Sequence, residues 1–432
     1  MRMMGLKVAE KRSLNDDVMN ERERALVISP EFPYPLTSGG TQRTFHILRA
    51  LSRAHRVDLV TFSEHPSPEG WDVLSALCSQ IHLIALPPHP KTPLAFFRRN
   101  LSRAIRGINP LVDRFADPTI RQAVNDWLAG HRYDLILMEH SWIAPYIEDI
   151  RASGNRGAFT VLDAHNVESE LWRQYYRQPA RWWTKPALYR YWQSARRIEQ
   201  RYFDRFDVVL AVSPSDREKI LRLAPRASVA IIPNGIELPP HRHDPSTGDR
   251  PPVVGFVGSL DYPPNHLGLE WFLARVWPRI AQRLPEAQFV IIGRGDRQRL
   301  KRLCRGQETV RLAGAVPDLT PYLSRMAVMV VPLRHGSGTR IKILEAWAHG
   351  IAVVSTSRGA EGLPCQHMEN IWIADEASDF AAAVIYLLTD HATRRRLARS
   401  AYEEVQSYSW SVIEERLPAV LDRRGVARGQ SR

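Results

Sequence analysis

The stretch from Met329 to Gly350 holds the residues best suited to bind a charged ligand. A strand-like apolar run precedes the turn Gly336-Ser337-Gly338-Thr339, and a helical pattern follows and stops at Gly350. Glycines let the backbone approach a ligand closely, and the amides at a helix start are unpaired donors with partial positive charge. Arg340 and Lys342, which we expect in the first helical turn, add the full charges that a leaving diphosphate needs. The stretch therefore predicts a phosphate site.

Glu345 lies in the same helical pattern, between Leu344 and Ala346, on a helix that is otherwise largely apolar. A carboxylate in such surroundings needs hydroxyl or cationic partners. The two hydroxyls of a ribose suit it well. The alternative is an ion pair with Lys342 or Arg340 at helical spacing, which the sequence leaves open.

A second polar cluster, Asp163 to Glu168, follows the apolar run that ends at Leu162. A single histidine after a strand is more often a packing or capping residue. Here His165 has Asp163, Asn166 and Glu168 as neighbours, so a ligand contact is the sharper interpretation. Glu139 and His140, at the end of another strand-like run, are weaker candidates.

Gly39 and Gly40 stand between the first strand-like run and an amphipathic pattern from Gln42 to Leu51. They predict a second loop at a helix entrance, suited to a phosphate or a sugar. The three spaced glycines of a dinucleotide fingerprint are missing, which disfavours a nicotinamide-dependent oxidoreductase. Ser213 and Ser215 follow a further strand, and we interpret them as helix caps.

The elements that must position these residues are short β-branched runs separated by helical patterns, as in parallel sheets with crossover helices. The fold class is therefore α/β, with two facing Rossmann-like doubly wound domains and a cleft between them. Open parallel sheets bind ligands beyond the carboxyl ends of their strands. The expected strands are 25–29, 57–62, 81–86, 135–139, 159–162, 208–212 and 229–232 in the first half, and 253–257, 289–292, 310–312, 328–331, 352–355 and 371–373 in the second.

Five segments divide the chain. We expect a polar tail over 1–22, an acceptor domain over 23–237, a Pro- and Asp-rich linker over 238–252, a donor domain over 253–405, and a C-terminal helix with a basic tail over 406–432. The helix, from Trp410 to Leu421, is expected to pack back across both domains.

The net charge of +13 favours an anionic partner, such as nucleic acid, anionic lipid or a phosphorylated small molecule. The three cysteines, Cys78, Cys304 and Cys365, are far apart, and we expect buried thiols rather than a disulfide or zinc site. No apolar stretch approaches the roughly 20 residues that span a bilayer, and residues 1–24 lack a signal core, so a cytoplasmic protein is expected.

Two segments, 96–106 and 172–206, interleave arginines with aromatic residues. Such a composition suits the inner surface of a membrane with anionic headgroups. Alternatively, the rings face the core or each other and the arginines are solvated. Nucleic acid is disfavoured, because no recognised binding module accompanies the stretch.

Gly336 to Ala346 matches the signature Gly-Ser-Gly-Thr-Arg-x-Lys-x-x-Glu-Ala, and the chain thereby resembles glycosyltransferase family 4, in its bacterial exopolysaccharide and capsule branch. Segments 232–236, 255–265 and 354–363 extend the resemblance. It implies a retaining GT-B enzyme that moves a sugar from a nucleotide sugar to a glycan or a lipid-diphosphate-linked acceptor. By resemblance Glu345 holds the donor ribose and residues 336–340 hold the diphosphate and part of the sugar. The other implied donor contacts are Gly39, Gly40, His165, Gly258 and Ser259.

One position departs from the family pattern. Relatives often carry a glutamate eight residues before the one matched by Glu345, and Ser337 stands there. The donor sugar therefore stays open. Without an Asp-x-Asp pair we expect no metal and no cofactor beyond the nucleotide sugar, so that Arg340, Lys342 and backbone amides carry catalysis. The rival functions are a sugar-nucleotide epimerase of the same fold and a non-catalytic sugar-nucleotide-binding protein.

Overall fold

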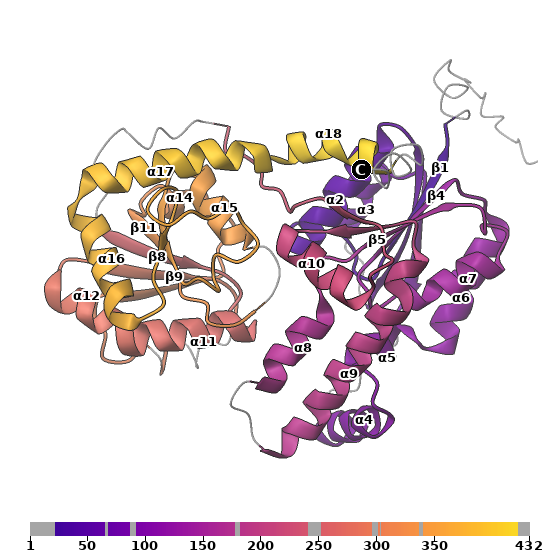
Figure 1. Cartoon of the computed structure of the whole chain (residues 1–432), viewed down its shortest axis with the longest axis horizontal. Coiled ribbons are helices and arrows are strands. Elements are labelled where there is room, and N and C mark those ends of the chain that lie inside the picture. The colour runs from indigo at the N-terminus through magenta and orange to yellow at the C-terminus, as the bar shows by residue number, and fades with distance from the viewer. Residues whose placement is uncertain are drawn as a thin grey trace, which may run out of the picture.

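A computed structural model describes residues 22–64, 68–86, 92–177, 182–240, 252–295, 301–302, 304–336 and 340–421. Nearly all of the expected N-terminal tail, most of the linker, the signature residues Ser337 to Thr339 and the basic tail after Leu421 lie outside these ranges. Two α/β domains lie side by side, and the C-terminal helices run along one side of both (Figure 1). The predicted fold class is confirmed.

The first domain is built on a sheet of seven parallel strands in the order β3-β2-β1-β4-β5-β6-β7. The order reverses direction between β1 and β4, which creates a topological switch point at the carboxyl end of β1. The strands are β1 (Arg24–Ser29), β2 (Arg56–Ser63), β3 (Gln80–Ala85), β4 (Leu135–Glu139), β5 (Phe159–Asp163), β6 (Val208–Ala211) and β7 (Val229–Ile231).

Helices cover both faces of this sheet. Successive residues of β1 point to opposite faces, so that Leu26 and Ile28 enter one apolar cluster while Ala25 and Val27 enter the other. The helices are α2 (Gly39–Ser52), α3 (Pro68–Ser75), α4 (Pro93–Arg106), α5 (Pro110–Phe115), α6 (Pro118–Gly130), α7 (Ile147–Ala152), α8 (Glu168–Arg177), α9 (Lys185–Tyr202) and α10 (Pro214–Leu223). Helices α4, α8 and α9 extend away from the sheet at the lower end of Figure 1.

Two helix starts differ from expectation. Helix α2 begins at Gly39 rather than Gln42, because the Ser38 and Thr41 side chains form a capping box around the first turn. Gly39 and Gly40 are therefore helical residues and not a loop. Ser213 caps α10 as predicted, whereas Ser215 lies inside the helix and donates to Glu361 of the second domain.

The second domain has six parallel strands in the order β10-β9-β8-β11-β12-β13. Its strands are β8 (Val253–Val257), β9 (Gln288–Ile292), β10 (Val310–Gly314), β11 (Val328–Val331), β12 (Ala352–Ser355) and β13 (Trp372–Ile373). The main helices are α11 (Pro263–Trp271), α12 (Trp277–Arg283), α14 (Thr320–Leu323), α15 (Ile341–Ala348), α16 (Ala377–Thr389) and α17 (His391–Val405). The switch point here lies between β8 and β11, next to the candidate phosphate site.

The last helix, α18 (Trp410–Leu421), leaves the second domain and packs on α2 of the first. Trp410 stacks on His46 with ring centroids 4.2 Å apart, and the buried Glu414 carboxylate accepts hydrogen bonds from Arg49 and Arg53 at 2.6 and 2.5 Å. The His46 ring contacts the same carboxylate at 2.7 Å. The C-terminal segment thus ties the two domains together.

The structure also bears on the expectations about the cysteines and about membrane-spanning segments. Cys78 is buried as predicted, but Cys304 and Cys365 are only half-buried. Among the helices in the described ranges, none combines the length and apolarity that crossing a bilayer requires.

Candidate functional site

A cavity of about 710 Å³ lies between the two domains. Its wall includes residues that follow the carboxyl ends of β1 and β5 in the first domain and of β8 and β11 in the second. Seven of the predicted site residues line it together: Gly39, Gly40, His165, Gly258, Arg340, Lys342 and Glu345. Residues far apart in the sequence are therefore brought into one site.

The remaining predicted residues lie elsewhere. Ser259 does not line the cavity, and its carbonyl oxygen accepts a hydrogen bond from the Asn265 side chain at 2.7 Å. Gly336 also lies outside the lining, and its amide donates to Gln174 Oε1 of α8 at 2.7 Å. Ser337, Gly338 and Thr339 are outside the described residues.

Lys342 is held against the turn at Gly258. Its ammonium donates to Asn265 Oδ1 at 2.8 Å and lies 4.4 Å from the centre of the Phe256 ring. Gly258 has a φ of +154°, and a Cβ there would lie 2.7 Å from Lys342 Nζ. Burial, with the nearby Arg340 charge, lowers the pKa of Lys342 to about 7. An anion placed beside this ammonium would therefore be strongly attracted and would keep it charged.

Glu345 lies on the cavity side of α15, next to the buried residues Leu344 and Ala346. Burial raises the pKa of its carboxyl group to about 7, and the charge of Lys342 opposes this shift. Among the described residues Glu345 forms no ion pair, so the salt bridge left open by the sequence is not formed. The carboxylate is available to hydroxyl groups of a ligand.

Arg340 is the residue before α15, not part of its first turn as predicted. Its side chain is 5% exposed, and burial lowers the pKa of the guanidinium while the Tyr262 hydroxyl opposes that shift. The guanidinium also lies beside Gly336. The charge is therefore held between Gly336 and the cavity.

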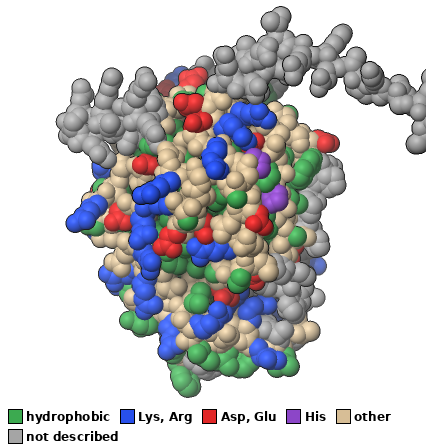
Figure 2. All heavy atoms as spheres, turned by 90° about the vertical axis from the view of Figure 1, so that its right-hand side faces the viewer, with side chains coloured by type: hydrophobic (Ala, Val, Ile, Leu, Met, Phe, Trp, Pro, Cys, Tyr) green, Lys and Arg blue, Asp and Glu red, His purple; other side chains and the backbone are tan. Residues whose placement is uncertain are grey.

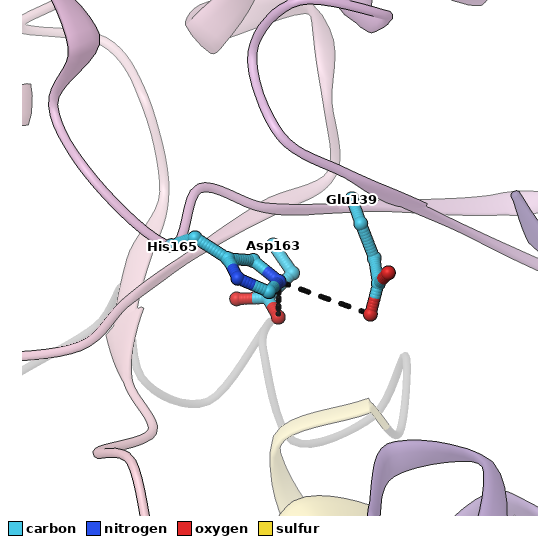
Figure 3. Close-up of side chains that lie close together, drawn as sticks. All are labelled: Glu139, Asp163 and His165. Atoms are coloured by element: carbon cyan, nitrogen blue, oxygen red, sulfur yellow. Dashed lines mark ion pairs between the residues drawn. The ribbon is translucent and has the colours of Figure 1, made fainter. Parts of the chain in front are cut away.

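His165 forms a buried cluster with Asp163 and Glu139, three side chains from the ends of two neighbouring strands (Figure 3). Its Nε2 is 3.1 Å from Asp163 Oδ2 and 3.8 Å from Glu139 Oε1. Burial alone would lower the pKa of His165, but the two carboxylates outweigh it and raise the pKa to about 9. The His140 ring packs on His165 with the ring centroids 4.0 Å apart and the planes tilted by 31°, and His140 does not line the cavity.

Arg43 is a site residue that the sequence reasoning missed. Its Nε and Nη2 donate to the two oxygens of Asp163 at 2.7 and 2.8 Å, and both side chains are buried. The pKa of Asp163 is lowered, because the attraction of Arg43 and His165 exceeds the effect of burial. An arginine four residues before the buried Ile47, on the apolar side of an amphipathic helix, was the available signal.

Glu139, Asp163 and His165 also have the separations of a metal site, since one ligand atom from each lies within 4.8 Å of the others. Arg43, however, already occupies both Asp163 oxygens. A cation added there would meet a fixed positive charge at short range, which is unfavourable.

The cavity continues to the loop after β10, where Val316 to Thr320 form part of its wall together with Leu323 and Leu333. No motif in the sequence predicted this end of the cavity. Most of the side chains at this end are apolar, with Asp318 and Thr320 as the polar ones, and such a lining suits a flat heterocyclic ring better than a second anionic group.

Comparison with known proteins agrees with this two-domain fold. A family model described as "Glycosyltransferase Family 4" matches residues 37–238, and one described as "Glycosyl transferases group 1" matches residues 251–390, so the two cover most of the chain. The chain is 23% identical to an uncharacterised protein of the cps region of Klebsiella pneumoniae, over 89% of this chain and 95% of that protein.

Other relatives match in part. The chain is 28% identical to a phosphatidyl-myo-inositol mannosyltransferase of Mycolicibacterium smegmatis over 50% of its own length, and the match spans only 57% of that enzyme. Among solved structures, sucrose-phosphate synthase from Thermosynechococcus elongatus superposes with a TM-score of 0.69 at 21% identity, covering 92% of this chain and 98% of that one. Anabaena HepE, solved in complex with UDP and glucose, gives a TM-score of 0.62 at 14% identity, covering 93% and 99%.

Proposed function

The chain belongs to glycosyltransferase family 4, and we propose that it transfers a sugar, with retention, from a nucleotide sugar to a glycan or lipid-linked acceptor in the synthesis of a cell-surface polysaccharide. The observation that carries this proposal is the cavity itself. One domain contributes Arg340, Lys342 and Glu345, and the other contributes His165 and the start of α2. A ligand with an anionic centre and hydroxyls at both ends fits this distribution of groups.

We assign each part of the donor to the cavity residues whose chemistry complements it. The diphosphate lies by Lys342, Gly258 and Arg340, the ribose hydroxyls lie on Glu345, and the base lies along Val316 to Thr320. The transferred sugar, which we expect to be a hexose, then points towards His165. This placement gives every charged or hydroxyl-bearing part of the donor a partner of complementary chemistry.

Catalysis in this arrangement is electrostatic. The acceptor oxygen bonds to the anomeric carbon as the bond from that carbon to the diphosphate breaks, and the hydroxyl proton passes to the departing phosphate oxygen on the same face. Lys342, Arg340 and backbone amides stabilise the charge that develops on the diphosphate. The ion pair with Arg43 keeps Asp163 charged beneath His165, which stabilises an imidazolium at the sugar end.

We also propose that no divalent metal takes part, because cations of the protein already face the diphosphate and Arg43 occupies the one carboxylate cluster of metal-site geometry among the described residues. Activity should then survive EDTA and gain nothing from added Mg²⁺ or Mn²⁺. A loss on chelation that Mn²⁺ restores would contradict this part of the proposal.

The decisive experiment incubates the purified protein with a panel of UDP-, GDP- and dTDP-hexoses and the lipid-linked glycans that accumulate in a strain lacking the gene. Sugar transfer with retained anomeric configuration is expected, as read by mass spectrometry and NMR of the product. Epimerised donor without transfer would support the epimerase instead. Donor binding without turnover on any acceptor would indicate a non-catalytic binding protein.

A membrane-facing surface is the second part of the proposed function. On α4 the side chains of Leu94, Phe97, Leu101 and Ile105 recur every three or four residues and are 68%, 62%, 48% and 67% exposed. Trp182, just before α9, is 79% exposed. Arg190 of α9 donates to two carbonyl oxygens of α4, so the two helices form one tip.

The charges of this tip are of one sign. Residues 93–106 and 182–198 contain no acidic residue, and Arg98, Arg106, Arg190, Arg196 and Arg197 are exposed. Basic and hydrophobic side chains lie together at the lower end of the face in Figure 2, which is the end that carries α4 in Figure 1. Apolar side chains beside arginines suit a bilayer surface with anionic headgroups.

Many rings of the second basic and aromatic segment face one another instead. Trp172 packs against Tyr175 and Tyr191, and Tyr176 stacks on Trp192. Arg181 and the side chains of Phe96 and Trp183 lie outside the described part of the chain. The proposed membrane surface is therefore centred on α4 and Trp182.

Vesicle sedimentation tests this surface. Phe97→Asp should abolish binding to vesicles that contain phosphatidylglycerol, while Tyr386→Asp, at a 43% exposed ring of the second domain, should leave it unchanged. Equal binding by both variants, or equal binding to neutral phosphatidylcholine vesicles, would contradict the assignment.

A further inference from the structure

Gln174 of α8 forms a hydrogen bond between the two domains that the proposed mechanism does not use. In Figure 1, α8 lies on the side of α9 that faces the second domain. Gln174 Oε1 accepts the amide proton of Gly336 in that domain at 2.7 Å. Gln174 is half-buried and does not line the donor cavity, so it is not itself a donor contact. No motif in the sequence predicted a role for this residue.

The orientation of the Gln174 amide group is set by its own helix. Its Nε2 atom donates to Glu170 Oε1 at 3.4 Å, one turn earlier on α8. Glu170 in turn accepts two hydrogen bonds from Arg173 at 2.6 and 2.8 Å. Because the nitrogen faces a carboxylate, the oxygen faces the Gly336 amide, and both ends of the Gln174 side chain have partners of the correct kind.

Helix α8 is held firmly against α9. The amide of Ser169, in the first turn of α8, donates to the two oxygens of the fully buried Glu199 carboxylate at 3.3 and 3.2 Å. Further along, the Trp172 ring packs edge-on against Tyr191, with the ring centroids 5.4 Å apart. The Gln174 side chain therefore projects from a helix whose start and middle are fixed.

Gly336 provides the surface on which the Arg340 guanidinium lies. Its φ is +116°, and a Cβ built on it would lie 2.9 and 3.2 Å from the two terminal nitrogens of Arg340. A side chain at this position would displace the guanidinium, whereas glycine leaves room for it and adopts the positive φ without strain. The direction of the Arg340 charge thus depends on how the Gly336 peptide is turned.

Tyr175, the next residue of α8, lies near another neighbour of Arg340. Burial raises the pKa of Tyr175, and the nearby hydroxyl of Tyr262, in the wall of the donor cavity, raises it further. Burial also raises the pKa of Tyr262, and the Arg340 guanidinium opposes that shift because its charge lies close to the phenol. Two consecutive residues of a first-domain helix are therefore close to two neighbours of Arg340, which are Gly336 and Tyr262.

We propose that Gln174 is a positioning residue for sugar transfer: by fixing the Gly336 peptide, it orients the Arg340 guanidinium towards the donor diphosphate. The assignment rests on the proposed glycosyltransferase function. A charge that stabilises a departing group must be oriented before the bond breaks, because reorientation during the reaction would cost part of the stabilisation. In this arrangement the first domain contributes to stabilising the leaving group without touching it.

Two substitutions isolate the hydrogen bond. Gln174→Met keeps the length of the side chain and removes the acceptor oxygen, whereas Gln174→Glu keeps an oxygen that can accept the Gly336 amide proton. Sugar transfer to the lipid-linked glycans from a strain lacking the gene measures kcat and the donor KM. Gln174→Met should lower kcat about tenfold and change the donor KM less than about threefold, while Gln174→Glu should keep at least roughly a third of the wild-type kcat.

A double-mutant cycle with Arg340→Lys tests whether Gln174 acts through Arg340. Lysine keeps a positive charge, so that the rate stays measurable, but it lacks the planar group that lies on Gly336. Added to Arg340→Lys, Gln174→Met should lower kcat by no more than about twofold, since the group that it positions is gone. Lys219→Met, which breaks the ion pair with Glu361 between the same two domains, is the control and should change kcat by the same factor in both backgrounds.

The results separate positioning from a general loosening of the two domains, and melting temperatures show that the variants compared are folded. A loss in Gln174→Met that persists in full in the Arg340→Lys background, as for Lys219→Met, would overturn the assignment. An unchanged kcat in Gln174→Met, or a Gln174→Glu variant that is equally impaired, would also overturn it and would leave the proposed function intact. A wild type that transfers sugar from no donor would instead refute the proposed function, and this assignment with it.

Discussion

The pH dependence of donor binding offers the sharpest test of the cavity, because two groups of opposite charge both titrate near neutrality. Burial raises the pKa of Glu345 to about 7 and lowers that of Lys342 to about 7. Ribose hydroxyls favour the carboxylate, and a diphosphate favours the ammonium. Donor affinity should therefore rise with pH as Glu345 loses its proton, and fall at higher pH as Lys342 loses its own.

The size of the change in donor affinity on each side of the pH profile follows from the coupling between proton binding and donor binding. If the donor binds only the ionised form of a group, each pH unit beyond its pKa costs about 1.4 kcal/mol, or roughly tenfold in affinity. The profile should be a bell centred near pH 7, about tenfold weaker at pH 6 and at pH 8 than an unshifted carboxyl and amine would give. Groups with ordinary pKa values would give a flat profile over this range.

Two variants test which group is responsible for the acid side and which for the alkaline side of the pH profile. Glu345→Gln should remove the acid limb and weaken binding at pH 7 by roughly 10- to 150-fold, since a hydrogen bond to a charged group contributes about 1.5–3 kcal/mol. Lys342→Met should remove the alkaline limb. Isothermal calorimetry from pH 5.5 to 8.5 measures both, with intact nucleotide sugars as ligands because their phosphate diesters do not titrate there. An acid limb that survives in Glu345→Gln would refute the assignment.

Three further variants test the framework around the cavity. Gly258→Ala should weaken donor binding more than tenfold because its methyl group would displace the neighbouring ammonium, while Gly157→Ala, where a Cβ meets nothing within 4 Å, should bind donor normally in the same calorimetric titration. Arg43→Met should destabilise the first domain by about 3–5 kcal/mol in urea unfolding, because it removes the guanidinium that pairs with both oxygens of the buried Asp163 carboxylate and leaves only His165 beside it. Glu414→Ala should lower the melting temperature by several degrees, whereas the exposed Glu415→Ala should not; equal shifts would contradict a role for the buried carboxylate in fastening α18.

The sequence predicted the strands well, because β-branched runs bounded by turn residues have few other ways to bury themselves. The helical pattern placed Lys342 and Glu345 on one helix, and the family resemblance added Gly258, which lies beside Lys342. Asn265 lay inside a recognised segment, but its bond to Lys342 depends on how α11 and α15 approach one another. The local sequence pattern does not determine how closely these two helices approach.

Other features depend on which rings stack across elements. Trp142 follows β4 by three residues and carries no motif, and it is connected to the His165 cluster because His140 packs between the two rings. The helix start at Gly39 was missed for a different reason. A Ser38–Thr41 capping box is a weaker sequence signal than two glycines, yet it stabilises the first turn enough to make them helical.

The distribution of charge across the cleft makes the distance between the domains part of the chemistry. The cations for the diphosphate belong to the second domain, and the His165 cluster belongs to the first. Contacts between the domains lie close to the cavity: Gly336 donates to Gln174, and Lys219 pairs with Glu361 at 2.9 Å. Because a Cβ at Gly39 would overlap the Ile341 side chain, this glycine permits the close approach of α2 and α15.

Helix α18 makes a further connection between the two domains. It belongs to the second domain by chain connection, yet Trp410 and Glu414 are fastened to α2, the helix whose first turn lines the cavity. A change in the angle between the domains must therefore move α2 or strain its contacts with α18. Electrostatic catalysis requires that the groups of both domains be positioned together around the donor, and α2 is the helix that both lines the cavity and contacts α18.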